Sequence, residues 1–283
     1  MGGVVAANCS GPRRRLYGAT RDMVIGMHVA TTGGELIQSG GMVVKNVAGY
    51  DVQKLLIGSF GTLGAMCSVN FKLSPKPEAT ATFVLASGTL DEALAARDRV
   101  LRGALQPAAL DMVNAAAAAE LGLAGGAALL VRAGGSGRVL DRFARELAGA
   151  ARLEQEAESE LWRAVEDFAA AGVEANPESV VVRAGCPMLA LGAVLAAARG
   201  PALARAGTGL AWLRYENAAA AREGIAALNA AGADALIEWS GDGVPDDFER
   251  WPGADDGLEL MRQVKSVFDP EGLLNPGRLH GRI

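Results

Sequence analysis

The stretch Gly58-Ser-Phe-Gly-Thr-Leu-Gly64 places three glycines within seven residues, and two more glycine-containing stretches precede it. These are Gly2-Gly-Val-Val-Ala-Ala-Asn-Cys-Ser-Gly-Pro-Arg-Arg-Arg-Leu-Tyr-Gly18 and Val44-Lys-Asn-Val-Ala-Gly-Tyr-Asp-Val-Gln-Lys-Leu55. Glycine lets the backbone adopt positive φ and approach a ligand closely, so that N–H groups can bind phosphate oxygens. None of the three has the spacing of a dinucleotide-binding G-x-G-x-x-G motif or of a P-loop. Taken singly, each stretch is either a ligand-contacting backbone or an ordinary turn, and a Rossmann-like or kinase-like site is excluded.

Short strands and turns surround these stretches. Residues 23–30 and 35–38 predict a β-hairpin around Thr32-Gly33-Gly34. Residues 67–73 alternate with period two, which predicts a strand that is stopped by the prolines at 75 and 77. The apolar face of that strand is expected to carry Cys67, Val69, Phe71 and Leu73.

From residue 79 the pattern becomes an alternation of strands and helices. Strands are expected at 81–86, 127–132, near 152, and at 179–183, 210–215 and 234–239. Thr89 and Glu92 form a capping box that opens a helix, and the alanines at 115–119 read as helical. Two successive β-α-β-type units fit an antiparallel sheet that helices cover on one face. We detect no sharp internal repeat.

The composition of the chain disfavours several classes of protein. The chain has 283 residues, a net charge of −5 and 21% charged residues, which is ordinary globular composition. No apolar run reaches the roughly 18 residues of a membrane span. The acidic balance, with a pI of about 5.2, disfavours general nucleic-acid binding. The one basic run, Arg13-Arg14-Arg15, is either a solvated loop or a phosphate or partner contact.

Cysteine and histidine are scarce. Cys9, Cys67 and Cys186 are widely spaced, which argues against a disulfide framework and a zinc ribbon and fits a reducing compartment. We expect each to be a small buried apolar residue. The chain has two histidines, His28, which is expected in a strand, and His280. With so few histidines, a Ser-His-Asp triad is disfavoured.

Taken in order, the three glycine-containing stretches resemble the PCMH-type (vanillyl-alcohol-oxidase-type) FAD-binding domain. The tail Phe268-Asp-Pro-Glu-Gly-Leu-Leu-Asn-Pro-Gly-Arg278 resembles the end of the FAD-linked oxidase C-terminal domain. Within that superfamily the sequence is most similar to the FAD-binding subunits of bacterial glycolate oxidase. The resemblance covers the two ends of the chain, and the middle matches in architecture only.

The resemblance implies FAD as cofactor and supplies candidate contacts to it. Gly2, Gly3, Asn8, Ser10 and Gly11 match the turn that lies along the flavin. Gly61, Thr62 and Gly64 match a second contact, next to Phe60, where relatives often have an acid. Asn275 matches a tail asparagine near the flavin ring. The resemblance also places Lys45 and Tyr50 near the cofactor pocket, without a settled role. The alternative for Lys45 is a surface charge, and the alternative for Tyr50 is a half-buried packing residue.

Two departures from the family pattern matter. The family's FAD domain has two parts, and we expect Met1 to lie inside the second, so that the loop gripping the pyrophosphate would be absent. Related hydroxy-acid dehydrogenases carry an H-x-G-D-G-N-x-H metal motif; here Gly241-Asp-Gly243 remains, but Trp239 and Asp246 replace the histidines. We therefore expect no metal site and see no general base, with Asp242 a turn residue.

The sequence predicts an α+β protein: the C-terminal half of a PCMH-type FAD domain (1–78), a ferredoxin-like antiparallel cap (79–255), and a helix and tail that return to the FAD domain (256–283). The resemblance implies a glycolate oxidase (dehydrogenase) subunit that passes hydride to flavin and electrons to a partner. It also implies a homologous flavoprotein subunit and an iron–sulfur subunit as partners, in the cytoplasm or peripheral at the inner membrane face. The alternative is a flavin-free structural subunit; RNA binding is disfavoured.

Overall fold

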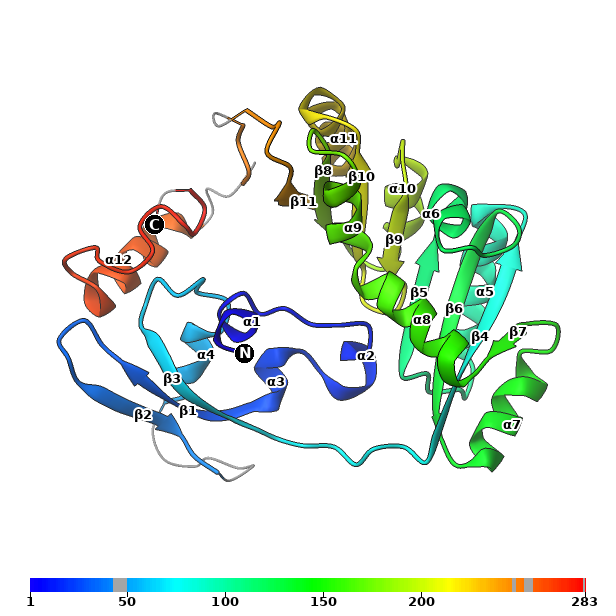
Figure 1. Ribbon diagram of the computed structural model, residues 1–283, viewed down its shortest axis with the longest axis horizontal. Helices are drawn as coiled ribbons and strands as arrows, with labels where there is room; N and C mark the ends of the chain where they lie inside the picture. Colours follow the sequence, from blue (N-terminus) through cyan, green and yellow to red (C-terminus); the bar gives the residue numbers. More distant parts are fainter. Residues whose placement is uncertain (43–49, 246–247, 252–256, 282) are drawn as a thin grey trace. The chain divides into compact units, whose positions relative to one another are not determined.

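The computed structural model describes residues 1–42, 50–245, 248–251, 257–281 and 283. The chain divides into two compact units (Figure 1). Unit 1 consists of Met1–Pro75 and Gly253–Ile283, and unit 2 consists of Lys76–Pro252. Unit 1 therefore combines the beginning and the end of the chain.

Unit 1 is built on a three-stranded antiparallel sheet in the order β2-β1-β3. The strands are β1 (Val24–Ala30), β2 (Leu36–Gly40) and β3 (Ala65–Phe71), and the predicted hairpin of β1 and β2 is confirmed. The helices are α1 (Gly2–Ala6), α2 (Arg14–Tyr17), α3 (Thr20–Met23), α4 (Gln53–Leu56) and α12 (Leu258–Phe268). Val264 and Phe268 of α12 pack against the core of the sheet, so the C-terminal segment belongs to this unit.

The apolar face predicted for β3 is wrong at both of its ends. His28 of β1 lies opposite Ser68, but Val29 lies opposite Met66, so Cys67 is an extra residue in β3. Such a bulge shifts the side chains beyond it to the other face of the sheet. The side chains that pack against the core are Met66, Val69 and Phe71, while Cys67 and Leu73 are exposed.

Unit 2 contains an eight-stranded sheet in the order β11-β8-β10-β9-β5-β6-β4-β7, in which every pairing is antiparallel. The strands are β4 (Ala79–Ser87), β5 (Ala109–Val113), β6 (Ala127–Gly135), β7 (Ala151–Leu153), β8 (Val180–Gly185), β9 (Ala202–Arg205), β10 (Leu210–Tyr215) and β11 (Asp234–Ser240). The helices are α5 (Leu90–Arg102), α6 (Ala115–Glu120), α7 (Gly137–Glu146), α8 (Gln155–Glu166), α9 (Phe168–Ala175), α10 (Leu191–Ala196) and α11 (Ala218–Ala230). The predicted α+β class is confirmed.

The eight strands form two consecutive ferredoxin-like modules of identical topology. The elements β4-α5-β5-β6-α7-β7 make the first βαββαβ unit, and β8-α10-β9-β10-α11-β11 make the second. Each module has its strands in the spatial order fourth, first, third, second. The modules join edge to edge through β5 and β9. The sequence predicted two successive β-α-β-type units without a sharp sequence repeat, and it did not predict the two joining strands.

Helices lie on both faces of this sheet, which corrects the expected single covered face. One core is formed with α5, α7, α10 and α11, and a second core on the other face is formed with α6, α8 and α9. Figure 1 shows α8 and α9 running across the sheet. On this face Glu158 of α8 is buried and accepts hydrogen bonds from Thr82 (3.1 Å), from Thr80 and from Arg132 Nε (2.9 Å).

No helix in the described ranges is long and apolar enough to cross a membrane. The longest, α5 and α11, have 13 residues each.

The predicted capping box of α5 is present and can be tested. The Thr89 side chain accepts from the Glu92 N–H (3.2 Å), and Glu92 Oε2 accepts from the Thr89 N–H (3.2 Å). Thr89→Ala is expected to lower the free energy of unfolding by about 1 kcal/mol, because the helix loses its side-chain cap. All four tryptophans lie in unit 2, so urea unfolding followed by tryptophan fluorescence measures this unit. Ser136→Ala is the control, because Ser136 directly precedes α7 and its side chain makes no cap bond. Equal losses of unfolding free energy in both variants would contradict the role of Thr89 as the cap of α5.

Candidate functional site

Three segments that are distant in the sequence meet in unit 1. They are residues 1–11, the turn at 58–64 and the tail at 273–277, which we call the three-segment junction. The Phe60 N–H donates to the Ala6 carbonyl (2.9 Å), and the Gly58 N–H donates to the Val5 carbonyl (3.3 Å). From the tail, Asn275 Nδ2 donates to the Phe60 carbonyl (2.8 Å). The structure thus brings together the three segments that contain most of the residues that the sequence assigned to the cofactor.

The backbone of the junction is strained. Asn8 (φ 51°), Phe60 (φ 53°) and Asn275 (φ 42°) are non-glycine residues in the left-handed region, and each lies in a different one of the three segments. Only two other non-glycine residues of the described chain share this conformation, Gln155 and His280. The left-handed conformation costs roughly 1–2 kcal/mol for a residue such as Phe60, whereas asparagine adopts it more readily. Such residues gather at functional sites, so their clustering here points to one.

Two predicted glycines of the turn have different reasons to be glycine. Gly61 has φ +73°, and a Cβ there would lie 2.8 Å from Asn275 Nδ2. Its missing side chain is what admits the tail asparagine. Gly64 is buried, and a Cβ there would lie 2.5 Å from Val29 Cγ1. Gly64 is therefore required by packing against β1, while its predicted flavin contact stays a prediction.

Lys265 of α12 anchors the tail to the turn. Its Nζ donates to the Thr62 carbonyl (2.8 Å), to the Leu274 carbonyl (2.7 Å) and to the Asp269 carboxylate. Asp269, which is almost fully buried, also accepts from the N–H groups of Leu273 (3.0 Å) and Leu274 (2.7 Å). Sequence reasoning missed this pair. The available signal was the i, i+4 spacing of a lysine and an aspartate at the end of the predicted helix.

The surroundings of Asp269 shift its pKa. Burial acts to raise the pKa, but the hydrogen bonds from Lys265 and from the Leu274 and Leu273 N–H groups outweigh burial and hold the pKa at about 2. Hydrogen bonds to the charged form of a carboxyl group favour that form. Asp269 therefore stays ionised in the folded protein and keeps its bond to Lys265.

A lowered carboxyl pKa predicts a pH-dependent stability. The ordinary value is 3.8 and the folded value about 2, so the ionised group stabilises the fold fully above about pH 4. This contribution is lost as the pH falls from 4 to 2. The stability difference between wild type and Asp269→Asn should be constant from pH 7 to 5 and shrink towards zero near pH 2, measured by denaturant titration with circular dichroism. Asp242→Asn, an exposed turn residue, is the control and should change stability at no pH. A stability difference between wild type and Asp269→Asn that does not change with pH would contradict the lowered pKa of Asp269.

The profile of the family described as FAD linked oxidases, C-terminal domain, matches residues 251–279, which include α12 and the tail of the junction. Parts of the chain are similar in sequence to FAD-linked oxidases and to glycolate oxidase subunits. It is 38% identical over 114 residues to glycolate oxidase subunit GlcD of Bacillus subtilis (strain 168), covering 40% of this chain and 24% of the relative. It is 44% identical over 79 residues to glycolate oxidase subunit GlcE of Escherichia coli (strain K12), covering 28% and 23%.

The chain thus spans about a quarter of the length of these two curated relatives. A solved structure of alkyldihydroxyacetonephosphate synthase superimposes with a TM-score of 0.67 at 14% sequence identity. That match covers 97% of this chain and 57% of the other chain, and it supports the fold only.

The other residues assigned to FAD from the family resemblance lie as follows. Gly2 and Gly3 begin α1, exposed, with open space where a Cβ would stand. Ser10 Oγ accepts from the Thr20 N–H (3.1 Å). The exposed Gly11 follows it, and the Thr62 hydroxyl is buried and donates to the Ser59 carbonyl (2.7 Å). Lys45 lies outside the described residues.

Tyr50, also assigned to FAD, is 92% exposed, so the alternative of a half-buried packing residue is wrong. Cys9 and Cys67 are exposed as well, against the expectation of buried cysteines. For Cys67 the reason is the bulge in β3. Cys186 is partly buried, and His28 lies in β1 as expected, with Nδ1 2.8 Å from Ser68 Oγ.

The Gly241-Asp-Gly243 segment, compared above with a family metal motif, is a packed turn. The Gly241 N–H donates to the Ser179 carbonyl (3.0 Å) and the Gly243 N–H to the Pro177 carbonyl (3.0 Å). A Cβ on Gly241 would lie 1.9 Å from the Pro177 carbonyl oxygen, and Asp242 is exposed. Within the described ranges, no three His, Cys, Asp or Glu side chains come close enough to hold a metal ion.

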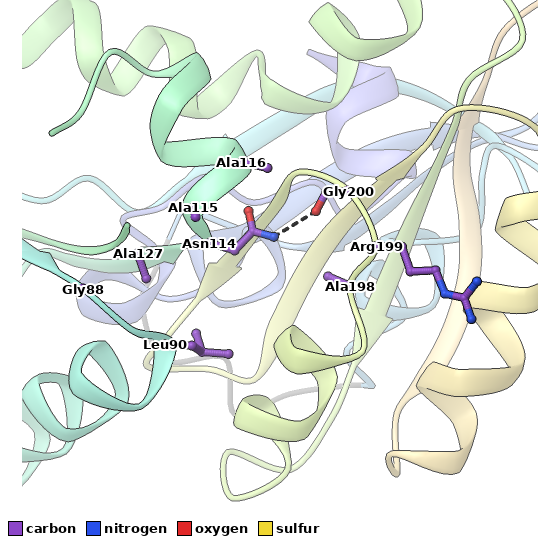
Figure 2. Close-up of a pocket in the computed structure, with 9 residues that line it drawn as sticks. All are labelled: Gly88, Leu90, Asn114, Ala115, Ala116, Ala127, Ala198, Arg199 and Gly200. Carbon is purple, nitrogen blue, oxygen red and sulfur yellow. Dashed lines mark hydrogen bonds between the residues drawn. The ribbon is translucent and has the colours of Figure 1, made fainter. Parts of the chain in front are cut away.

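A pocket of about 380 Å³ lies in unit 2, at the end of the sheet where β5 runs into α6 (Figure 2). Its lining is mostly alanine and glycine, together with Leu90, Asn114 and Arg199. The Asn114 amide is already used: Nδ2 donates to the Gly200 carbonyl (2.8 Å), and Oδ1 accepts from the N–H groups of Ala117 and Ala202 (both 3.0 Å). Asn114 therefore connects the two ferredoxin-like modules.

Proposed function

We propose that this chain binds FAD at the three-segment junction and serves as a subunit of an FAD-dependent 2-hydroxy-acid oxidoreductase of the glycolate oxidase type. The reaction is the oxidation of glycolate to glyoxylate, with electrons leaving to a partner. The observation that carries the proposal is the junction itself: residues from both ends of the chain that match the FAD-linked oxidases converge there with strained backbone.

The junction fits a cofactor with a negatively charged pyrophosphate. Its three segments contain no Asp or Glu. Gly2 and Gly3 leave open space, so a ligand can come close to the backbone of α1. The residues proposed to hold FAD are Gly2, Gly3, Asn8, Ser10, Gly11, Gly61, Thr62, Gly64 and Asn275, with Lys45 and Tyr50, which precede the turn in the sequence.

When bound, the flavin supplies the redox chemistry by accepting a hydride from the carbon that bears the hydroxyl group. The chain's own residues bind and orient: the glycines give backbone access and Asn275 provides a fixed amide. We assign no general base, because no histidine, aspartate or glutamate lies in the junction segments. Substrate chemistry would then sit mainly on a homologous flavoprotein subunit, with an iron–sulfur subunit as the electron acceptor.

The test is the visible absorption spectrum of the purified chain, recorded with added FAD and again after desalting. A retained flavin spectrum supports cofactor binding, and bleaching on addition of glycolate with the partner subunits supports the electron-carrying role. A chain that is colourless after saturation with FAD and desalting contradicts the proposal. Asn114→Ala is a useful control for unspecific loss of FAD, because Asn114 lies in unit 2.

A flavin-free assembly subunit is the second candidate. Sixteen large apolar residues of the described chain are exposed, and twelve of them belong to unit 1. They include Met1, Val4, Leu36, Leu55, Leu260 and Val267. An excess of exposed apolar surface marks a protein–protein contact. A colourless chain that still forms a stable complex with the partner subunits would favour this candidate.

A further inference from the structure

The ammonium group of Lys265 is unusual in having three protein acceptors and little contact with solvent. Its side chain is 12% exposed, although lysine is among the residues that are seldom buried. The three acceptors are the Thr62 carbonyl (2.8 Å), the Leu274 carbonyl (2.7 Å) and the Asp269 carboxylate. A lysine has three N–H donors, so all of its donors are used.

These acceptors connect the two segments that meet at Asn275. Thr62 follows Phe60 and Gly61 in the turn, and Leu274 directly precedes Asn275 in the tail. The Lys265 bonds therefore join the same two segments as the bond from Asn275 Nδ2 to the Phe60 carbonyl (2.8 Å). Two independent links, one through Lys265 and one through Asn275, hold the tail against the turn.

The chemistry of the site requires an ammonium group in particular. Three acceptors converge on one point, and a compact ammonium can satisfy them all, whereas the planar guanidinium of arginine presents its donors in a fixed fork. Without the ammonium, the Thr62 and Leu274 carbonyls would lose their donor in a partly buried place, which is costly. The position of Asn275, whose φ is 42°, would no longer be fixed.

We propose that Lys265 is a positioning residue that holds Asn275 against Phe60 and so fixes the turn to which the flavin binds. The inference rests on the proposed FAD-binding function for its ligand. The positions of the turn and the tail can also be measured without FAD.

The test compares Lys265→Met with Lys54→Met in the full chain. Methionine keeps much of the side-chain volume and removes the charge. Lys54 is a suitable control because it also pairs with an aspartate of its own unit, Asp51, but is 39% exposed and bonds to neither segment. Lys265→Met is expected to weaken FAD binding by about tenfold or more, and Lys54→Met by less than about twofold.

Hydrogen exchange without FAD is the second readout. In Lys265→Met, exchange should become faster at the Leu273 and Leu274 amides and also at the Gly58 and Phe60 amides, which lie in the turn. The third readout is the visible spectrum of flavin bound at saturating FAD, which should change shape only if the residues around it have moved. Lys265→Arg should recover less than half of the lost affinity, because it keeps the charge but not the convergent donors.

The outcomes separate this inference from the proposed function. If wild type binds no FAD, the function fails, and exchange at Gly58 and Phe60 alone decides the role of Lys265. If wild type binds FAD and Lys265→Met binds it equally with an unchanged spectrum, the positioning role is overturned while the function stands. Full recovery by Lys265→Arg would also overturn it, since charge alone would then suffice.

Discussion

Arg205→Met is expected to lower the free energy of unfolding of unit 2 by about 3–5 kcal/mol, because it leaves a buried carboxylate without its partner. Arg205 in β9 and Asp111 in β5 are directly opposite each other at the joint of the two ferredoxin-like modules, where they form an ion pair. Asp111 is fully buried and Arg205 is 6% exposed. The Arg205 guanidinium also stacks on Trp212, with 4.8 Å from Cζ to the ring centroid.

The effect of Arg205→Met should depend on pH in a defined direction. Burial raises the pKa of Asp111 to about 6, Arg205 lowers it, and Glu166 raises it. Because the folded pKa lies above the ordinary 3.8, the contribution of this carboxyl to stability is complete below about pH 4 and is lost as the pH rises through 6. Removal of Arg205 raises the folded pKa further. The variant's deficit should therefore be larger at pH 8 than at pH 5.

Urea unfolding followed by tryptophan fluorescence at both pH values measures this deficit. Arg199→Met is the matched control, because Arg199 also pairs with an acid, Glu223 (3.1 Å), but both side chains are about two-thirds exposed. An exposed pair is worth about 0–1 kcal/mol. The double variant Asp111→Val/Arg205→Met removes both charges and should recover most of the loss. A deficit below about 1 kcal/mol at pH 8 would show that the pair does not matter to the joint.

Gly61→Ala is expected to disrupt the three-segment junction and reduce FAD affinity by about tenfold or more. The new methyl group would meet Asn275 Nδ2 at 2.8 Å, which forces the tail asparagine away from the Phe60 carbonyl. In addition, an alanine at φ +73° costs about 1–2 kcal/mol of backbone strain. The contact with Asn275 changes the proposed site, whereas the backbone strain lowers only the stability of the fold.

Gly34→Ala separates the two effects. Gly34 lies in the β1–β2 hairpin with φ +82°, and nothing lies within 4 Å of a Cβ there. Both variants should lose a similar stability in denaturant unfolding of unit 1, but only Gly61→Ala should lose FAD affinity and protection of the Phe60 amide from hydrogen exchange. If both variants bind FAD as tightly as wild type does, the contact between Gly61 and Asn275 has no role in binding.

Local patterns in the sequence were reliable where the signal itself is local. The β1–β2 hairpin follows from the turn glycines and the flanking apolar residues, and the capping box at Thr89 and Glu92 follows from a three-residue spacing. The resemblance of the two ends of the chain to FAD-linked oxidases also rests on short contiguous motifs. These features depend on residues that are neighbours in the chain.

The predictions that failed depend on distant partners. Strand β5 is buried on both faces and β9 has only four residues, so neither has an alternating pattern by which to be recognised. The bulge at Cys67 arises from the register with β1, which the sequence of β3 alone does not contain. The second helix-covered face follows from α8 and α9 folding back onto the sheet.

By itself, the sequence determined the α+β class, most of the helices and strands, and the glycines and the asparagine proposed for FAD. Only the tertiary structure decided that Asn8, Phe60 and Asn275 share one strained junction, that Lys265 ties it together, and that an Asp111–Arg205 pair joins two like modules. The physical reason is that periodicity and turn chemistry are set by residues a few positions apart. A buried hydrogen bond or ion pair is set by which distant segments the fold brings into contact.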